Sequence, residues 1–165
     1  VSKDVIAVAD IGSRSTTFSV LEDLKVVYSR DEAFGGVQLT EEIQRRYGMS
    51  FEEAAIAKKA GSLPEDYEPE VLEPFKENLI SEISRALQFF YSSSETTDID
   101  ILVIAGGCAS ISNLAGLIES KLEIKTIIAN PFSEMTISPK VNKKILANDA
   151  PSLMIACGLA MRGGV

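Results

Sequence analysis

The stretch that most constrains the fold is the amino-terminal VIAVADIGSRSTTFSVLE, in which an apolar run ends in Asp10 and a second run follows a short turn. Residues 5–9 are continuously apolar, as in a strand that is covered on both faces. Residues 16–21 are rich in β-branched and apolar side chains, and Gly12 marks the reversal between the two runs. A third run covers residues 25–29. The chain is therefore predicted to open with an antiparallel meander of three strands.

The second half of the chain alternates between strand and helix patterns. Residues 101–105 and 124–128 are apolar runs of strand length. Apolar side chains spaced three or four apart predict helices over 70–91, 111–122 and 152–161. Strands joined by helical crossovers lie parallel, through right-handed connections. The predicted fold class is α/β: a five-stranded mixed sheet with helices on both faces, the ribonuclease-H-like arrangement.

A small helical insertion at residues 35–69 separates the three-strand meander from the second half of the chain. In it, two short helical patterns precede a polar loop that contains proline. We predict that residues 1–34 and 92–165 form the core and that the long helix at 70–91 packs on it. Residues 35–69 would form a small subdomain.

Several helix ends are marked by local signals. Gly48 ends the first helical pattern of the insertion, and Gly61 ends the second. Ser50 and Glu53 have the spacing of a capping box, which gives Glu53 a structural role. Ser152 is interpreted as the N-cap of the final helix, whose small residues would let a sheet or another backbone approach closely.

Composition excludes several function classes. The 165-residue chain contains no histidine, which rules out Ser-His-Asp and Cys-His nucleophile systems and zinc sites with histidine ligands. A net charge of −8 without a long basic stripe argues against a nucleic-acid partner. Cys108 and Cys157 are predicted to be reduced thiols in the core, as suits a cytosolic protein, with a disulfide as the alternative. No apolar run approaches the roughly 18 residues needed to span a membrane.

The turn after the first strand admits two interpretations. Asp10 followed by Gly12, Ser13 and Thr16 is compatible with an acid that stabilises its own turn. Alternatively, backbone N–H groups and hydroxyls hold phosphate oxygens while Asp10 positions a metal-bound water. The residues of this turn leave both interpretations open.

A second candidate feature is the pair Gly106 and Gly107, which ends the fourth strand. Two glycines between a strand and a helix let the backbone pass close to a base, ribose or phosphate, although they could simply make a tight turn. In the predicted topology the first and fourth strands are neighbours, so both turns face one crevice. A two-metal nuclease would need further carboxylates beside Asp10, and none is found at the end of the fourth strand.

Three stretches carry a family resemblance: FGGVQLTEEIQRRYGMSFEEA, RALQFFYSS with the later IAGGCASISNLAGLIE, and NDAPSLMIACGLAMRG. The combination resembles the second lobe of the actin-like ATPase superfamily, which includes actin, sugar kinases, heat-shock chaperone ATPases and FtsA. Within it, the stretches closely resemble the PilM family, the cytoplasmic actin-like proteins of type IV pilus assembly. The similarity spans essentially the whole chain and covers the carboxyl-terminal half of the family's usual length.

The resemblance implies a site for ATP or ADP with Mg²⁺. Asp10 matches the position that holds magnesium-bound water, and Lys58 lies where relatives place a lysine near the nucleoside. Lys58 and its neighbour Lys59 could equally be solvated helix charges. Ala55 departs from the many relatives that have an acid at this position. The remaining matches are Gly12, Ser13 and Thr16 in the second phosphate loop, and Gly106 and Gly107 in the adenosine motif.

The resemblance also implies a cellular role: the nucleotide-binding lobe of a component of the type IV pilus assembly complex, which serves twitching motility. Such a protein is cytoplasmic and lies at the inner face of the bacterial inner membrane, with a PilN-like membrane protein and other pilus assembly proteins as partners. The family binds PilN through an amino-terminal lobe that we expect to be absent here. This lobe alone is therefore expected neither to catalyse efficiently nor to bind PilN, and its self-association stays open. The alternatives are an FtsA-like division polymer and half of a sugar-kinase-type phosphotransferase.

Overall fold

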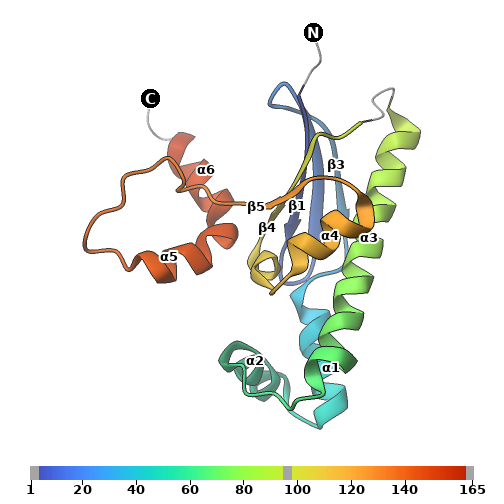
Figure 1. Cartoon of the computed structure of the whole chain (residues 1–165), viewed down its shortest axis with the longest axis vertical. Helices are drawn as coiled ribbons and strands as arrows, with labels where there is room; N and C mark the ends of the chain where they lie inside the picture. The colour runs from blue at the N-terminus through green and yellow to red at the C-terminus, as the bar shows by residue number, and fades with distance from the viewer. Residues whose placement is uncertain (1–3, 95–97, 163–165) are drawn as a thin grey trace.

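The computed structural model describes residues 4–94 and 98–162, and the predicted core also includes residues 1–3, 95–97 and 163–165, which lie outside the described part (Figure 1). The strands are β1 (Val5–Ile11), β2 (Thr16–Glu22), β3 (Lys25–Glu32), β4 (Ile101–Ala105) and β5 (Thr126–Ile128). The helices are α1 (Gly36–Tyr47), α2 (Phe51–Ala60), α3 (Glu73–Ser93), α4 (Leu114–Leu122), α5 (Lys143–Asp149) and α6 (Met154–Arg162). Three short turns of other helical types complete the chain: a π-helical turn η1 (Glu68–Leu72) and 3₁₀ turns η2 (Gly107–Ser110) and η3 (Ala150–Leu153).

The strands form one five-stranded mixed sheet in the order β3-β2-β1-β4-β5. β1, β2 and β3 pair in antiparallel fashion, whereas β4 pairs parallel to both β1 and β5. The predicted meander and the predicted parallel pairing of the two later strands are both confirmed. Because β1 and β4 are parallel neighbours, Asp10 lies opposite Ala105 at the carboxyl edge of the sheet.

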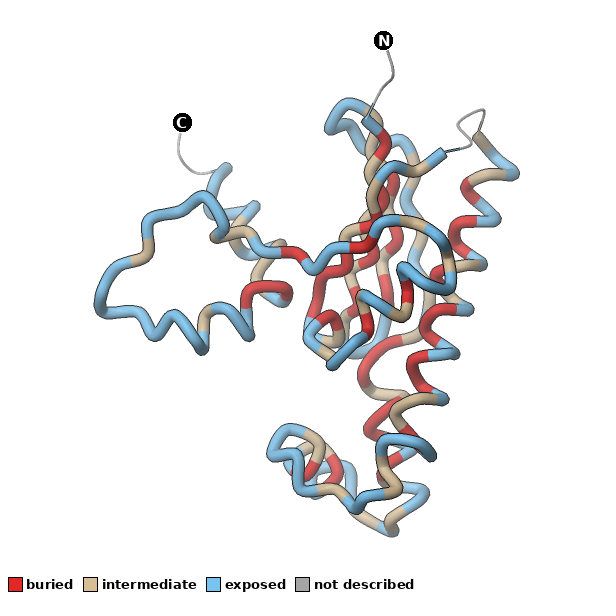
Figure 2. Tube along the Cα trace, in the orientation of Figure 1, coloured by how far each residue is buried: buried red, intermediate tan, exposed pale blue. Residues whose placement is uncertain are grey.

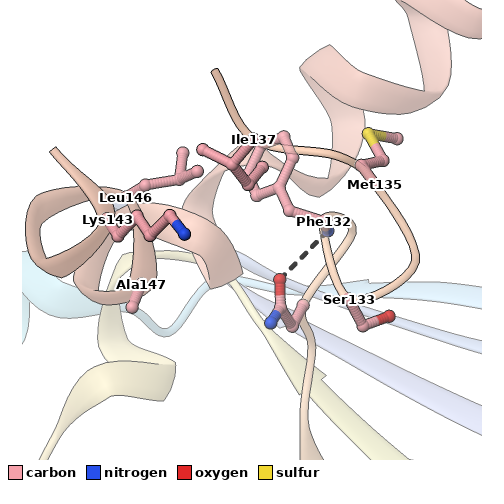
Figure 3. Close-up of a pocket in the computed structure, with 8 residues that line it drawn as sticks. Phe132, Ser133, Met135, Ile137, Lys143, Leu146 and Ala147 are labelled. Carbon is pink, nitrogen blue, oxygen red and sulfur yellow. Dashed lines mark hydrogen bonds between the residues drawn. The ribbon is translucent and has the colours of Figure 1, made fainter. Parts of the chain in front are cut away.

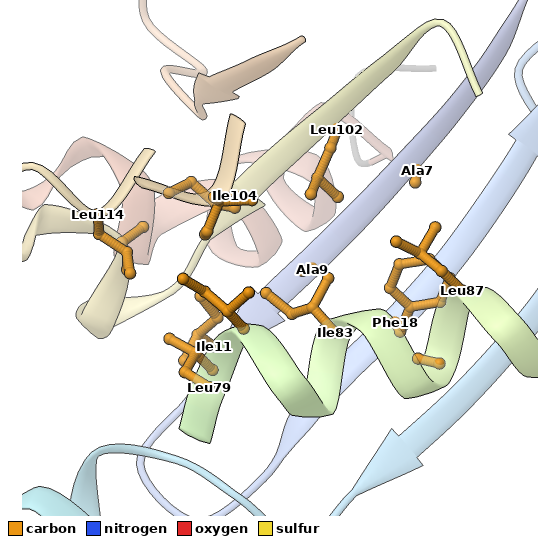
Figure 4. Close-up of a cluster of buried hydrophobic side chains, with 14 of the residues drawn as sticks. Ala7, Ala9, Ile11, Phe18, Leu79, Ile83, Leu87, Leu102, Ile104 and Leu114 are labelled. Carbon is orange, nitrogen blue, oxygen red and sulfur yellow. The ribbon is translucent and has the colours of Figure 1, made fainter. Parts of the chain in front are cut away.

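One face of the sheet forms the hydrophobic core. Burial alternates along β1, so that Ala7, Ala9 and Ile11 point toward the helices. The small side chains of this central strand leave room for large side chains of α3, such as Leu79 and Ile83 (Figure 4). At the far end of α3, the Phe90 ring packs edge-on against Tyr28 of β3, and that tyrosine in turn packs edge-on against Phe18.

The opposite face of the sheet is only partly covered. Ile6, Val8 and Val103 point to this face, and all three are half-buried. The predicted five-stranded mixed sheet with helices is thus confirmed, but its helical cover is complete on one face only. None of the described helices is long and apolar enough to cross a membrane.

Residues 130–162, which we call the C-terminal arm, project away from the rest of the molecule (Figures 1 and 2). The sequence of residues 130–148 has no clear periodicity and predicts mostly loop with one helical turn, but α5 forms a helix of seven residues. Among the described residues, α6 contains no buried side chain, so the close approach predicted for its small residues is not observed. Its predicted N-cap is also wrong, because Ser152 lies inside η3 and its hydroxyl donates to the Asp149 carbonyl at 2.7 Å.

The helix ends predicted in the insertion are confirmed. Gly48 and Gly61 both adopt the left-handed conformation that closes a helix. The Ser50 N–H donates to the Glu53 carboxylate at 2.7 Å, and the Glu53 N–H donates to the Ser50 hydroxyl at 3.2 Å. These hydrogen bonds lower the pKa of Glu53, whose role is therefore to cap α2. Cys108 is a half-buried free thiol, as is Cys157, so the disulfide alternative is not realised.

Candidate functional site

The turn between β1 and β2, residues 12–15, is tied to the first turn of α1. Within the turn, the Gly12 N–H donates to the Ser15 carbonyl at 2.9 Å. From α1, the N–H of Gly36 donates to the Gly12 carbonyl at 3.0 Å, and that of Val37 donates to the Ser13 carbonyl at 2.7 Å. Two of the N–H groups that a helix start leaves unpaired are thus satisfied by the turn. The β1–β2 turn and α1 consequently form one hydrogen-bonded unit.

Gly35 makes this close approach sterically feasible. A Cβ atom at this position would lie 2.6 Å from the Gly12 carbonyl oxygen and 2.8 Å from that of Ser13. The Gln38 side-chain oxygen accepts a hydrogen bond from the Gly35 N–H at 2.9 Å, which helps to fix the backbone at Gly35. A side chain at this position would therefore push α1 off the β1–β2 turn.

Gly106 brings the backbone after β4 close to the end of β1, an approach that was not predicted from the sequence. Its φ angle of 84° is in the left-handed region. An added Cβ would lie 2.3 Å from the Ile11 carbonyl oxygen and 2.6 Å from Asp10 Oδ1. Gly107 is different, because no described heavy atom lies within 4 Å of the place where its Cβ would be. A side chain at position 106 would therefore collide with the end of β1, whereas the backbone at Gly107 has open space beside it.

Asp10 presents a free carboxylate at this edge. The side chain is half-buried, and burial raises the pKa of its carboxyl group. It has no hydrogen-bond or ion-pair partner in the described part of the chain. That part also holds no group of three or more histidine, cysteine or acidic side chains able to share a metal ion. One free carboxylate fits a Mg²⁺ ion held mainly through water and phosphate oxygens, as is usual for this ion.

Thr16 does not belong to this surface. Its side chain is only 2% exposed and points to the same face of the sheet as Phe18. Its hydroxyl donates to the Phe34 carbonyl at 2.7 Å. The position therefore does not support the predicted contact with phosphate; Thr16 instead ties β2 to the segment that enters α1.

Lys58 of α2 reaches across to α1. Its ammonium group donates to the Thr40 hydroxyl at 2.7 Å and to the Gly36 carbonyl at 3.3 Å. Burial lowers the pKa of Lys58, and the interaction with Cys108 partly offsets that shift. The alternative of a solvated charge is therefore wrong for Lys58, while Lys59 is exposed. Two of the three ammonium protons are used, which leaves one for a ligand.

Cys108 lies between these groups. Its Sγ is 3.9 Å from the Gly12 carbonyl oxygen, and burial raises the pKa of the thiol. A raised pKa keeps the sulfur protonated at neutral pH, so the residue is a packing group and not a nucleophile.

Four of the predicted site residues line one cavity of about 370 Å³, which we call the turn cavity. It lies between the β1–β2 turn, the start of α1, one face of α2 and the backbone after β4. The predicted lining residues are Gly12, Ser13, Lys58 and Gly107, and the others are Gly36, Val37, Thr40, Phe51, Ala55 and Cys108. Asp10 and Gly106 do not line this cavity; Gly106 directly precedes the lining residue Gly107, and Asp10 lies two residues before Gly12.

The family model for the type IV pilus assembly protein PilM matches residues 1–164. The chain belongs to the PilM family.

Three solved structures share the fold of this PilM-family chain. The PilM–PilN type IV pilus biogenesis complex matches with a TM-score of 0.80 and 26% identity, over 97% of this chain and 46% of that one. The ethanolamine utilization protein EutJ from Carboxydothermus hydrogenoformans matches with a TM-score of 0.65 and 19% identity, over 97% of this chain and 49% of that one. Ta0583, an archaeal actin homolog in complex with ADP, matches with a TM-score of 0.65 and 17% identity, over 98% of this chain and 51% of that one. This chain thus spans about half the length of each.

The side chains of Val37, Thr40 and Phe51, which α1 and α2 contribute to the turn cavity, were not predicted from the sequence. Phe51, Ala55 and Lys58 follow one another at intervals of four and three along α2, so they share one helix face. Starting from Lys58, this spacing would have pointed to Phe51 and Ala55. Val37 and Thr40 had no comparable signal, because their position depends on how α1 meets the β1–β2 turn.

A second cavity lies in the C-terminal arm of this PilM-family chain, between the loop after β5 and α5 (Figure 3). It measures about 320 Å³ and contains none of the predicted site residues. Its walls combine apolar side chains with the polar side chains of Asn130, Ser133 and Lys143; the apolar ones are Phe132, Met135, Ile137 and Leu146. The Phe132 N–H donates to the Asn130 side-chain oxygen at 3.0 Å, which shapes the loop.

Proposed function

We propose that this chain is the nucleotide-binding lobe of a PilM-family protein and takes ATP or ADP with Mg²⁺ in the turn cavity. The observation that carries the proposal is the convergence of the β1–β2 turn, Gly107 and Lys58 around one cavity. The archaeal actin homolog Ta0583, which shares the fold, was solved with ADP. Residues 35–69 would act as a small subdomain that closes the nucleoside end.

Each group in the cavity has a definable task. The backbone and hydroxyl of Ser13, which is exposed beside Gly12, would face the phosphate oxygens. Gly107 lets the backbone run close to the nucleoside, and Lys58 offers its remaining N–H there. Asp10 would orient water molecules bound to Mg²⁺. When bound, that ion supplies positive charge that neutralises the phosphates.

The role of the whole protein is proposed from the family. The chain covers 46% of the PilM chain in the PilM–PilN complex. We propose that the intact protein acts on the cytoplasmic side of the inner membrane in type IV pilus assembly, with a PilN-like partner. Family membership favours this role over the FtsA-like and sugar-kinase alternatives. The PilN-like partner would bind the other half of the intact protein, so this chain alone should fail to capture a PilN amino-terminal peptide. Retention of the peptide on immobilised chain would contradict that assignment.

Calorimetric titration of ATP with and without Mg²⁺ tests the nucleotide site. We expect saturable heat that grows when Mg²⁺ is present. In Asp10→Ala the heat that depends on Mg²⁺ should disappear, because the Asp10 carboxylate is the group proposed to hold the metal-bound water. Exposed Asp149 of the C-terminal arm provides the matched control, and Asp149→Ala should behave like the parent. Absence of heat in the parent chain would contradict nucleotide binding by this lobe.

A further inference from the structure

The α2 wall of the turn cavity differs chemically from the wall made by the β1–β2 turn. Phe51, Ala55 and Lys58 form one face of α2, and Ala54 and Ala57 on the neighbouring face are buried. Lys58 anchors the carboxyl-terminal end of this face to α1 through its bond to Thr40. Phe51 stands two turns away at the other end. Between them, the small Ala55 side chain leaves the space over this face open.

Phe51 is an aromatic ring held in place but not covered. It is the first residue of α2, and the capping box formed by Ser50 and Glu53 fixes the backbone around it. Nevertheless, the residue is 48% exposed, and it lines the cavity. Exposed aromatic side chains are ordinary on a protein surface, but this one forms part of a cavity wall. The backbone that carries the ring is therefore held in place by the cap, and the ring itself offers an apolar surface to the cavity.

The lining of the cavity indicates which part of a nucleotide would meet this ring. Charged phosphates favour the end with the polar β1–β2 turn, where Ser13 is exposed. At the α2 end, Val37, Phe51 and Ala55 are apolar, and the described lining contains no carboxylate or amide side chain that could recognise base edges. Apart from the remaining Lys58 N–H, an aromatic base would find there mainly a ring face. Stacking on such a face tolerates any base, because every base has one.

We propose that Phe51 is the stacking wall for the base of the bound nucleotide. The inference rests on the proposed function and adds a residue and a mode of recognition to it. Since ring stacking does not depend on the base edges, Phe51 contributes equally to ATP and GTP.

Substitution of the ring gives the first test. Phe51→Ala should weaken the binding of both ATP and GTP by the same factor, between about 5-fold and 150-fold, the range of stacking contributions measured by alanine substitution. Binding of tripolyphosphate, which has no base, should be unchanged. Ile56 is the matched control, because it is 62% exposed on the same helix but does not line the cavity. Ile56→Ala should bind all three ligands like the parent.

A tryptophan reporter gives the second test. The chain contains no tryptophan, so Phe51→Trp introduces a single indole at the proposed stacking position. Its fluorescence should be quenched saturably by ATP and by GTP and left unchanged by tripolyphosphate.

The outcomes separate this inference from the proposed function. If the parent binds ATP and Phe51→Ala binds it equally well, stacking is refuted while the proposed function stands. Equal losses for ATP and tripolyphosphate would also refute it, since they would show a structural role for the ring. If saturating ATP does not quench the indole of the Phe51→Trp variant, stacking is likewise refuted. If the parent binds no nucleotide, the proposed function fails and the stacking role fails with it.

Discussion

At the junction between the β1–β2 turn and α1, backbone atoms of two segments meet within hydrogen-bonding distance, whereas the helices of the C-terminal arm expose most of their side chains. Glycine shows the contrast most clearly. Gly35 and Gly106 stand where a single added carbon would collide with backbone atoms. Gly158 of the arm has open space around it. The arm meets the rest of the molecule at η3, where the Pro151 carbonyl accepts a hydrogen bond from the Gly106 N–H at 2.8 Å, whereas α5 and α6 contain no buried residue in their described parts.

This difference bears on where a ligand site can be built. A binding site needs groups held in one arrangement, and packing and hydrogen bonds supply that rigidity at the junction. The C-terminal arm also contains a cavity, but a loop and a short exposed helix form its walls. Of two cavities of similar size, we therefore assign the nucleotide to the turn cavity. The predictions below test this contrast from the largest expected effect to the smallest.

Truncating a leucine should separate the two regions most strongly. Leu79 of α3 is fully buried in the core, whereas Leu159 of α6 is 60% exposed. Leu79→Ala should lower the free energy of unfolding by about 2–5 kcal/mol, since it removes buried surface and leaves a cavity. Leu159→Ala should change it by less than about 0.5 kcal/mol. Urea denaturation measures both, and equal losses would show that the arm is packed as tightly as the core.

The glycine pair after β4 gives the next largest contrast. Gly106→Ala forces a side chain into the left-handed region and against the Ile11 carbonyl, so a loss of about 1–3 kcal/mol in unfolding free energy is expected. Gly107→Ala should lie within about 0.5 kcal/mol of the parent. Urea denaturation of both variants measures this difference. A Gly107→Ala variant as unstable as Gly106→Ala would contradict the open space assigned to Gly107.

Within the C-terminal arm, a glycine substitution should act in the opposite direction. Gly158 lies inside α6, and an added Cβ meets no described atom within 4 Å. Gly158→Ala should therefore stabilise the helix, by roughly 0.5–1 kcal/mol, because alanine loses less backbone entropy there. Thermal unfolding followed by circular dichroism measures the change. A destabilised variant would show that the arm is packed against something at this position.

Asp10 provides the smallest effect and a pH signature. Burial raises the pKa of this carboxyl above its ordinary value of 3.8, so the folded chain keeps the proton to a higher pH than the unfolded chain does. Stability attributable to this group is then full below pH 3.8 and declines as the pH rises through the folded pKa. Asp10→Asn should remove that decline and be slightly more stable than the parent at neutral pH. Urea denaturation from pH 3 to 8 tests this, and a variant less stable at neutral pH would contradict it.

Local sequence signals predicted the parts of the fold that depend on neighbouring residues. The three-strand meander follows from β-branched runs separated by short turns, and the ends of α1 and α2 follow from Gly48, Ser50 and Gly61. The meeting of the ends of β1 and β4 followed from the topology, because parallel neighbouring strands end at one edge.

The differences have several physical causes. The small residues of α6 predicted a close approach by another backbone, but composition does not say what a helix packs against. Thr16 was matched to a phosphate loop, although strand alternation places it on the same buried face as Phe18. The position of Phe51 in a cavity wall depends on how α2 packs, and the seven residues of α5 have too little periodicity to be detected.

The most direct test of the account is an amide NMR spectrum of the isotope-labelled chain, recorded before and after saturation with ATP and Mg²⁺. We predict chemical-shift changes at the β1–β2 turn, at the start of α1, along the Phe51–Lys58 face of α2 and at Gly107, with α5 and α6 unchanged. Changes confined to the C-terminal arm, or no changes at saturating nucleotide, would contradict the assignment of the nucleotide to the turn cavity.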